Sequence, residues 1–440
     1  MNNDRENKMS VFYRKERRIN SNNIPAEVLF ILKELKKAGY LSFLVGGCVR
    51  DLLLQREVKD WDIVTDAKPK QIQKIFCQYK TFLIGKSVFT VSIILNHNEY
   101  QVSTIRGFKH KESFQNNRKL FEAIKEDLTL RDFTINAMCW SPYEGLLDLV
   151  NGLFDLKNKS IRSINPDIRF TEDPLRMLRA IRISCELSFV MTPEVKTSIA
   201  KNAFLVRLVS PERIKAELTF ILDSREAKQA LYLLCKFDLD RYIFGLDGIK
   251  KNQINKTEKN KLVFKGIKKL KKDLPSKLAL FGRMYYGSCK NAYLFYLPVI
   301  KFLRFPKETI KTVEILLKKE WEEVDFKNDI RIRFFLARFG KDNTWRFFLL
   351  KKTLLLEENK KLQIGNLKEE ERLIKDEIQK KPSLRISDLA INGDDLIKMG
   401  LPKGKKIGET LKMILEKVII NPDINRKEYL IKLVKNTHNR

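Results

Sequence analysis

The sequence has few histidines and no long apolar run, and each shortage excludes a class of protein. Only three histidines occur in 440 residues, so a metal centre or a hydrolase site built from histidine is not expected. A membrane-spanning helix needs about 18 or more consecutive apolar residues, and no such run is present. The N-terminus carries no apolar signal segment either. We therefore expect a protein without a membrane partner.

The six cysteines show no spacing that is typical of a metal site or a disulfide framework. None of the six cysteines forms a Cys-x-x-Cys pair or part of a dense framework. Such spacing is typical of free thiols in a reducing compartment, so we expect a cytoplasmic protein. The chain also shows no convincing internal repeat.

The charge balance, by contrast, is strongly basic. Lys and Arg number 86 against 55 Asp and Glu, which gives a net charge of +31 and a pI near 9.7. Charge of this size favours a polyanionic partner, with nucleic acid as the first candidate. A genome biased toward Lys, Asn and Ile codons is the alternative origin. The apolar fraction of 43% is sufficient for folded cores, and the length predicts two to four domains.

Hydrophobic periodicity divides the chain into an α/β part followed by helices. Residues 1–23 are polar and basic and are expected to form a disordered arm. From residue 167 the pattern is helical almost to the end, with one amphipathic helix expected over 169–187. Strands are predicted near 41–45, 61–64, 82–84, 88–95 and 99–105, with helices near 24–37, 48–54 and 69–78.

The most informative residues are two carboxylates that follow a glycine pair. Side chains alternate along a strand, so Asp60 and Asp62 on the predicted strand point to one face. Two such carboxylates repel each other, and a pair of divalent metal ions about 3.5–4 Å apart removes the repulsion. Upstream, Gly46 and Gly47 let backbone N–H groups approach an anion where a helix begins, and Arg50 follows one turn later. The pattern predicts a two-metal site for phosphoryl or nucleotidyl transfer.

This order of motifs resembles the class II tRNA nucleotidyltransferase and bacterial poly(A) polymerase family of the polymerase-beta-like superfamily. The resemblance covers roughly the first 225 residues and resumes near the C-terminus. It implies an α+β fold, in which a polymerase-beta-like nucleotidyltransferase head with a mixed β-sheet precedes all-α neck, body and tail domains. The implied boundaries are 24–164 for the head, 165–225 for the neck, 226–325 for the body and 326–440 for a tRNA-binding tail.

The chain departs from the family pattern at two positions. Gln101 stands where many relatives carry a glutamate, so the Gln101 amide or the nearby Glu99 would have to take the place of a third carboxylate. Leu130 replaces the first arginine of the second motif, which continues as Arg131-Asp-Phe-Thr. By resemblance, Arg131 contacts the phosphate or base of the incoming nucleotide, and Asp132 contacts the ribose hydroxyls. The alternative for Asp132 is a cap on a helix that begins at the next residue.

A third motif points to selection of the base. In Glu172-Asp-Pro-Leu-Arg176, Asp173 and Arg176 are three residues apart, so on a helix they reach one ligand. Cytosine and adenine each present an amino donor beside a ring acceptor, and a carboxylate next to a guanidinium complements both. Uracil and guanine mismatch both contacts, at about 1–3 kcal/mol for each unpaired buried group. In the resembling family this motif is the protein template, and Arg179 and Arg182 then meet the triphosphate. An ordinary helical ion pair is the alternative.

The C-terminal part carries a basic segment that resembles the tail of tRNA nucleotidyltransferases. Lys403, Lys405 and Lys406 lie beside Gly404 and Gly408 where a helix is predicted to begin, which is a suitable arrangement for gripping RNA phosphates. A solvated basic turn is the alternative.

Together these observations predict a template-independent enzyme that adds CCA to tRNA 3′ ends from CTP and ATP, with two Mg²⁺ ions at Asp60 and Asp62. A poly(A) polymerase that extends mRNA or other RNA 3′ ends shares every head motif. An enzyme that adds only CC or only A, and an inactive RNA-binding relative, are the remaining alternatives.

Overall fold

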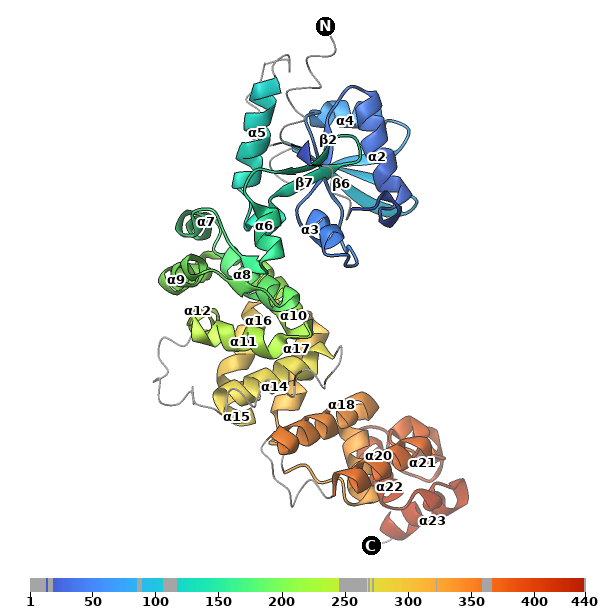
Figure 1. The fold of residues 1–440 in the computed structure, drawn as a ribbon. Coiled ribbons are helices and arrows are strands. Elements are labelled where there is room, and N and C mark those ends of the chain that lie inside the picture. The colour runs from blue at the N-terminus through green and yellow to red at the C-terminus, as the bar shows by residue number, and fades with distance from the viewer. Residues whose placement is uncertain are drawn as a thin grey trace. The chain divides into compact units, whose positions relative to one another are not determined.

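The fold is shown in Figure 1 as a computed structural model, which describes residues 13–14, 19–84, 89–105, 117–244, 267, 270, 273–321, 323–357 and 366–438. The chain divides into two compact units. Unit 1 comprises Met1–Val209 with Phe237–Leu239, and unit 2 comprises Ser210–Lys236 with Asp240–Arg440. The finer division into head, neck, body and tail stays a prediction.

An eight-stranded mixed sheet forms the centre of unit 1, in the order β1-β8-β7-β2-β3-β6-β5-β4. Strands β3 and β6 run parallel, while the other neighbours are antiparallel. The mixed sheet expected for the first part of the chain is therefore confirmed. The strands are β1 (Tyr13–Arg14), β2 (Ser42–Val45), β3 (Asp62–Thr65), β4 (Lys80–Ile84), β5 (Thr90–Leu95), β6 (Asn98–Thr104), β7 (Met138–Ser141) and β8 (Gly145–Asp148).

Strands β2 to β6 lie close to the ranges predicted from the sequence. Strand β1, however, lies within residues 1–23, which were expected to be disordered. Tyr13 and Arg14 pair with Leu147 and Leu146 of β8, and Ser21–Asn23 form a 3₁₀ helix, so the prediction of disorder is wrong for these residues. The rest of the basic cluster, residues 15–18, lies outside the described residues, as do residues 1–12.

Strand β2 is buried along its whole length, which fixes the position of the glycine pair that follows it. Phe43 and Val45 on one face pack in a core with Ile124 and Leu128 of α5. Because both faces of this apolar strand are packed, its end holds the backbone of Gly46 and Gly47 in a fixed position. The helices of unit 1 are α2 (Ala26–Lys37), α3 (Gly47–Leu53), α4 (Pro69–Ile75), α5 (Asn117–Thr129), α6 (Gly152–Lys157), α7 (Pro166–Glu172), α8 (Leu175–Leu187) and α9 (Pro193–Asn202).

The helix expected over 169–187 is in fact two helices, so that prediction is wrong. Helix α7 ends at Glu172, and α8 begins at Leu175. Asp173 between them is extended, with φ −145° and ψ 93°. The cause is Pro174, because a proline disfavours the helical conformation of the residue before it. Asp173 therefore lies at a bend and not on a helix face.

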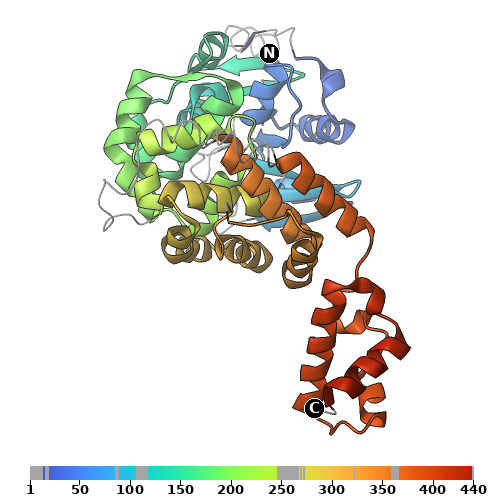
Figure 2. The same cartoon turned by 90° about the horizontal axis from the view of Figure 1, so that it is seen from below.

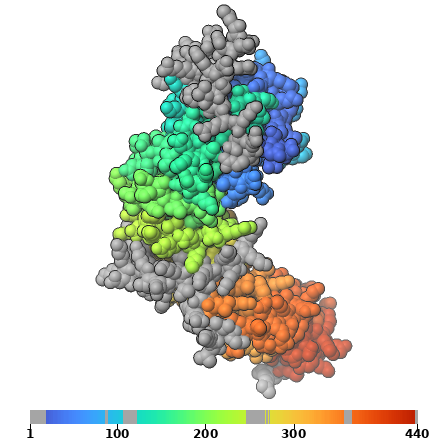
Figure 3. All heavy atoms as spheres, in the orientation of Figure 1, coloured from blue at the N-terminus to red at the C-terminus, as the bar shows by residue number. Residues whose placement is uncertain are grey.

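Unit 2 is helical, and its C-terminal helices form one packed group, coloured red in Figures 2 and 3. Leu396, Ile414, Val418 and Leu430 share the core of this group. None of the described helices is both long and apolar enough to cross a bilayer. The helices are α10 (Pro211–Asp223), α11 (Ala227–Lys236), α12 (Leu239–Ile243, at the boundary), α14 (Leu274–Tyr286), α15 (Cys289–Asn291), α16 (Leu297–Phe302), α17 (Lys307–Leu317), α18 (Asp329–Glu357), α20 (Leu367–Gln379), α21 (Gly393–Lys398), α22 (Lys405–Ile420) and α23 (Lys427–His438).

A buried arginine ties this group to α18. Arg333 donates to the carbonyl oxygens of Ile419 and Ile420 at the end of α22, at 2.6 and 3.0 Å. It also forms an ion pair with Glu377 of α20 at 3.1 Å. Arg333 and Glu377 are both almost fully buried, so these partners are needed to satisfy the charge.

Candidate active site

At the turn between β2 and α3, three of the predicted site residues lie close together: Gly46, Asp62 and Arg131. Gly46 has φ +86°, a conformation that L side chains rarely adopt. A Cβ at this position would lie 3.2 Å from Arg131 Nη1 and 3.6 Å from Asp62 Oδ2. The Gly46 backbone, the Asp62 carboxylate and the Arg131 guanidinium therefore converge, although they come from three separate segments.

This close approach leads to a testable expectation for Gly46→Ala. The new methyl group would push on Arg131, and the positive φ would add backbone strain of about 1–3 kcal/mol. We expect kcat/KM for nucleotide addition to fall at least tenfold, together with a lower melting temperature.

Gly39→Ala is the matched control, since Gly39 has φ +85° and nothing within 4 Å of the added Cβ. It should lose stability in the same way and keep its activity. If both variants lost activity equally, strain alone would explain the effect.

Asp62 lies in an environment that disfavours its charge. Burial raises the pKa of the Asp62 carboxyl; Arg131 opposes this shift, the nearby Asp60 carboxylate adds to it, and Arg179 opposes it as well. The structure thus places Asp60, Asp62, Arg131 and Arg179 within electrostatic reach of one another. A cation bound at the two carboxylates would relieve the repulsion between them.

The predicted strand geometry is wrong for Asp60, because β3 begins only at Asp62. Asp60 lies in the exposed segment before the strand. In the parallel pairing of β3 with β6, Gln101 stands directly opposite Asp62. Two carboxylates and an amide supply the oxygen ligands that Mg²⁺ prefers. The described residues contain no group of three or more His, Cys, Asp or Glu that could hold a metal ion, and Gln101 is the residue paired with Asp62 on the neighbouring strand.

Arg50 of α3 is more engaged than the sequence suggested. Its Nε and Nη2 donate to both carboxylate oxygens of Asp51, at 2.9 and 2.8 Å, and Nη1 donates to Asn136 Oδ1 at 2.8 Å. Gly47 packs beside the same guanidinium. A phosphate contact by Arg50 stays a prediction, and it would use the remaining N–H groups.

Asp132 is buried and saturated with hydrogen bonds. Oδ1 accepts from the Phe133 N–H at 2.8 Å and from Asn136 Nδ2 at 3.1 Å, while Oδ2 accepts from Arg179 Nε and Nη2 at 2.8 and 2.7 Å. Burial alone would raise the pKa of Asp132, but Arg179, Asn136 and the Phe133 N–H hold it below its usual value. The expected helix is a short 3₁₀ turn over Thr134–Asn136. A ribose contact would require one of these donors to be exchanged.

Arg176 presents an unused donor in a buried place. Nη2 donates to the carbonyl oxygen of Leu130 at 2.9 Å, and Nη1 is buried with no hydrogen-bond partner among the described residues, Glu172 being 3.9 Å away. Burial lowers the pKa of Arg176, while the Asp132 and Asp173 carboxylates oppose that shift. A buried donor without an acceptor costs about 1–3 kcal/mol. A ring nitrogen of a bound base would relieve this cost.

Arg182 ends the row of arginines on α8, and its partner is Glu186 at 3.1 Å. Glu186 also lies 3.9 Å from Arg56 and 3.7 Å from Lys59 in the segment that leads to Asp60. Sequence reasoning missed Glu186, although its spacing of four residues from Arg182 was a readable signal. It also missed Asn136, which lies four residues after Asp132 in the second motif.

The basic tail residues lie at the start of α22, as predicted. Lys403, Lys405 and Lys406 are exposed, and Gly404 precedes the helix with φ +122°. Lys405 lies 3.5 Å from Glu409 one turn later. The three ammonium groups are therefore accessible to a phosphate backbone.

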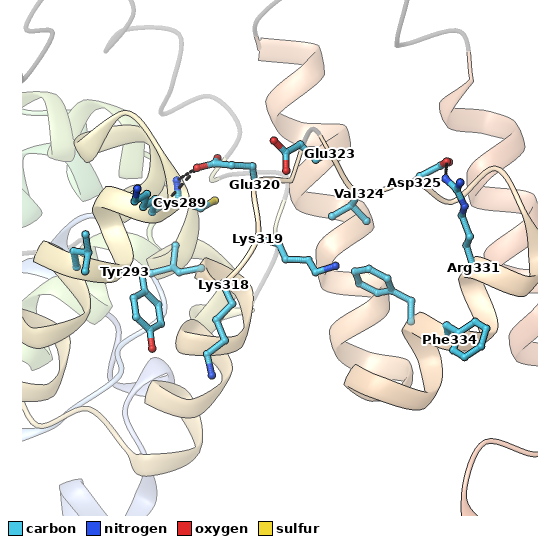
Figure 4. A pocket seen from close by; sticks show the side chains of 14 residues that line it. Cys289, Tyr293, Lys318, Lys319, Glu320, Glu323, Val324, Asp325, Arg331 and Phe334 are labelled. Carbon is cyan, nitrogen blue, oxygen red and sulfur yellow. Dashed lines mark hydrogen bonds and ion pairs between the residues drawn. The ribbon is translucent and has the colours of Figure 1, made fainter. Parts of the chain in front are cut away.

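A cavity of about 750 Å³ in unit 2 lies apart from these residues (Figure 4). Glu320 accepts the Cys289 N–H at 2.8 Å, Asp325 pairs with Arg331, and Lys319 lies over the Phe335 ring. None of the side chains predicted to act in catalysis or binding lines this cavity.

Family models match three parts of the chain. The poly A polymerase head domain matches residues 42–162, and a model described as "Probable RNA and SrmB- binding site of polymerase A" matches residues 188–246. A model of tRNA nucleotidyltransferase domain 2 matches residues 298–434. The matches therefore extend from the head into the C-terminal helices.

The similar proteins and solved structures reported below are all CCA-adding enzymes. The CCA-adding enzyme of Bacillus subtilis is 30% identical over 408 residues, which are 92% of this chain and 96% of that protein. The CCA-adding enzyme of Bacillus licheniformis is 37% identical over 227 residues, 51% of this chain and 57% of that protein. The solved structure of the Bacillus stearothermophilus CCA-adding enzyme in complex with CTP is 27% identical, with a TM-score of 0.74 over 94% of this chain and 98% of that one. The chain therefore belongs to the family of CCA-adding enzymes, which are nucleotidyltransferases.

Proposed function

We propose that the protein adds CCA to the 3′ ends of tRNA from CTP and ATP, with release of pyrophosphate. The observation that carries this proposal is the convergence of the Gly46 turn, Asp62 and Arg131 in a chain that resembles CCA-adding enzymes over nearly its full length. The reaction is an in-line attack of the tRNA 3′ hydroxyl on the α-phosphate of the nucleotide. Because none of the six cysteines forms a disulfide bond, as is usual in a reducing compartment, we place the enzyme in the cytoplasm.

Two Mg²⁺ ions are the proposed cofactor, held by Asp60 and Asp62, with the Gln101 amide opposite Asp62 as a further oxygen donor. When bound, they lower the pKa of the attacking hydroxyl and stabilise charge on the leaving group. The Asp60 carboxylate contributes to the raised pKa of Asp62, and a cation held by both side chains would relieve this repulsion, which supports the proposal.

The nucleotide would lie between the glycine turn and α8. Gly46, Gly47, Arg50 and Arg131 are the proposed phosphate contacts, with Arg179 and Arg182 farther along α8. The Asp132 carboxylate accepts a hydrogen bond from Arg179 and so orients its guanidinium. We also propose that Asp132 contacts the ribose hydroxyls of the nucleotide.

Base selection is proposed for the bend between α7 and α8. The Asp173 carboxylate accepts the exocyclic amino group of C or A, and Arg176 donates to the ring nitrogen. The buried Nη1 of Arg176, which lacks a hydrogen-bond partner among the described residues, supports this assignment.

A poly(A) polymerase remains the second candidate, since it shares the head motifs and the proline after Asp173. The tRNA nucleotidyltransferase match over residues 298–434 favours CCA addition. An inactive RNA-binding relative would have no need for paired carboxylates close to RNA phosphates.

Product length distinguishes these activities. The protein should be incubated with tRNA lacking CCA, with tRNA ending in CC and with unstructured RNA, supplied with CTP, ATP or both. Addition of CCA to the first tRNA and of A to the second, with no extension of unstructured RNA, is expected. Long A tails on any RNA would establish a poly(A) polymerase, and addition of only CC or only A would establish a partial enzyme.

The exposed lysines of α22 are expected to contribute to tRNA affinity. Replacing Lys403, Lys405 and Lys406 by Ala removes up to about three phosphate contacts, so tRNA should bind more weakly and the slope of log K against log salt should fall by about 2–3. The Kd for CTP should not change. Filter binding of tRNA at several salt concentrations measures both quantities.

A triple variant with the same loss of charge provides the control. Lys33, Lys70 and Lys74 are exposed lysines on α2 and α4. If their replacement by Ala weakened tRNA binding as much as the α22 variant, general charge would explain the effect.

A further inference from the structure

One side chain links the two halves of the proposed nucleotide site without belonging to either. Asn136 is 5% exposed and lies at the end of the 3₁₀ turn Thr134–Asn136. Its Oδ1 accepts from Arg50 Nη1 at 2.8 Å, and its Nδ2 donates to Asp132 Oδ1 at 3.1 Å. Asp132 in turn holds Arg179 of α8. A continuous chain of hydrogen bonds therefore runs from α3 to α8.

The chemistry of the partners fixes the orientation of the Asn136 amide. A guanidinium can only donate, and an ionised carboxylate can only accept. The oxygen of the amide must therefore face Arg50 and its nitrogen must face Asp132. Only a side chain with one acceptor and one donor at this spacing satisfies both neighbours, and in a buried place each failure is costly.

The two elements that Asn136 joins have different tasks in the proposed reaction. The turn before α3 meets the phosphates and carries Gly46 next to Asp62, while α8 begins beside the bend at Asp173 and carries Arg176. Catalysis requires that the base and the α-phosphate of one nucleotide be held in register, and small misplacements reduce the rate strongly.

We propose that Asn136 is a positioning residue that sets the register between the phosphate-binding turn and the base-selecting helix, acting through Arg50 and through Asp132 and Arg179. This inference rests on the proposed function. It predicts that kcat will depend on the donor and acceptor pattern at Asn136, because the amide oxygen is held by Arg50 and the amide nitrogen by Asp132.

Asn136→Asp is the sharpest test because it keeps the shape and replaces the donor toward Asp132 by an acceptor. Two carboxylates at hydrogen-bonding distance share a proton with a raised apparent pKa. At high pH both are charged and repel, so kcat should fall about tenfold or more below wild type, with KM for the nucleotide changing less. As the pH falls toward about 6, the shared proton restores a donor, and the ratio of variant to wild-type kcat should rise.

Two further variants separate this effect from a general defect. Asn136→Ala cannot regain a donor, so its kcat should be reduced by a pH-independent factor relative to wild type. Asn158→Asp adds the same charge at an exposed position and should behave as wild type. A pH-independent ratio for Asn136→Asp, or wild-type kcat for Asn136→Ala, would overturn the proposal.

A measurement that does not need activity keeps this inference distinct from the proposed function. The folded-state pKa of the new carboxylate pair is raised, so the stability of Asn136→Asp relative to wild type should be lost progressively as the pH rises. The deficit in melting temperature should therefore grow as the pH rises from about 4, the pKa of an Asp carboxyl in an unfolded chain, and level off above the apparent pKa of the pair. If this pattern appears while the wild-type protein fails to add CCA, the link is real and the proposed function is wrong. A deficit that does not change with pH would overturn the link itself.

Discussion

Replacing Asp62 by Ala should lower turnover by several orders of magnitude. The variant loses a metal ligand that lies beside the Gly46 turn and Arg131, and Asp60→Ala should lose a comparable amount. Folding should not suffer, since Asp62 is an exposed residue at the start of β3 and substitutions of exposed side chains usually change stability little. Affinity for tRNA should persist, because removing negative charge near RNA does not weaken phosphate binding. Single-turnover addition of CMP to tRNA measures the rate.

Asp342→Ala is a suitable control, since Asp342 is exposed on α18 in unit 2. It should keep the wild-type rate. If Asp60→Ala or Asp62→Ala retained more than about one part in a hundred of the wild-type rate, the assignment of the metal ligands would be wrong.

Asp173→Ala should narrow the preference for C over U by about tenfold or more, equivalent to about 1.4 kcal/mol for one lost discriminating contact. The variant loses the acceptor for the amino group but keeps Arg176, which can still donate to a carbonyl. Incorporation of C and A should fall, and U and G should be tolerated better. Competition between CTP and UTP on the same tRNA measures the change.

Asp173→Asn separates base recognition from support of the helix start. Asp173 Oδ1 accepts the Leu175 N–H at 3.3 Å, a contact that an amide oxygen can keep and a methyl group cannot. The Asn side chain also offers a donor, which suits the carbonyl of U or G. Equal losses for all four nucleotides in both variants, with selectivity unchanged, would mean that Asp173 supports the helix and that base choice lies elsewhere.

The sequence predicted the head well because its signals are local. The apolar runs predicted β2 and β6 close to their observed bounds, and Pro69 correctly predicted the first turn of α4. The site residues could be named because each lies in a motif. Their partners could not be named, since the contact of Arg50 with Asn136 spans 86 positions of sequence.

The errors have identifiable physical causes. The apolar periodicity of 169–187 is real, but Pro174 interrupts the backbone and separates α7 from α8. Asp60 was expected on the strand, but hydrogen-bonded pairing begins only at Asp62, and Lys59 and Asp60 are residue types that are depleted in strands. Strand β1 was missed because two residues in a polar segment carry no periodicity, and their order comes from pairing with β8.

The attachment of Arg333 to the last carbonyl groups of α22 determines how the tail can be studied. A protein cut before α22 would keep a buried guanidinium and lose two of its acceptors, so the remaining helices would be destabilised at their centre. Loss of RNA affinity in such a truncated protein would then report misfolding as much as a missing contact surface. The C-terminal helices therefore contribute to the stability of unit 2. Their proposed role in RNA binding is best tested by substituting exposed side chains in the intact chain.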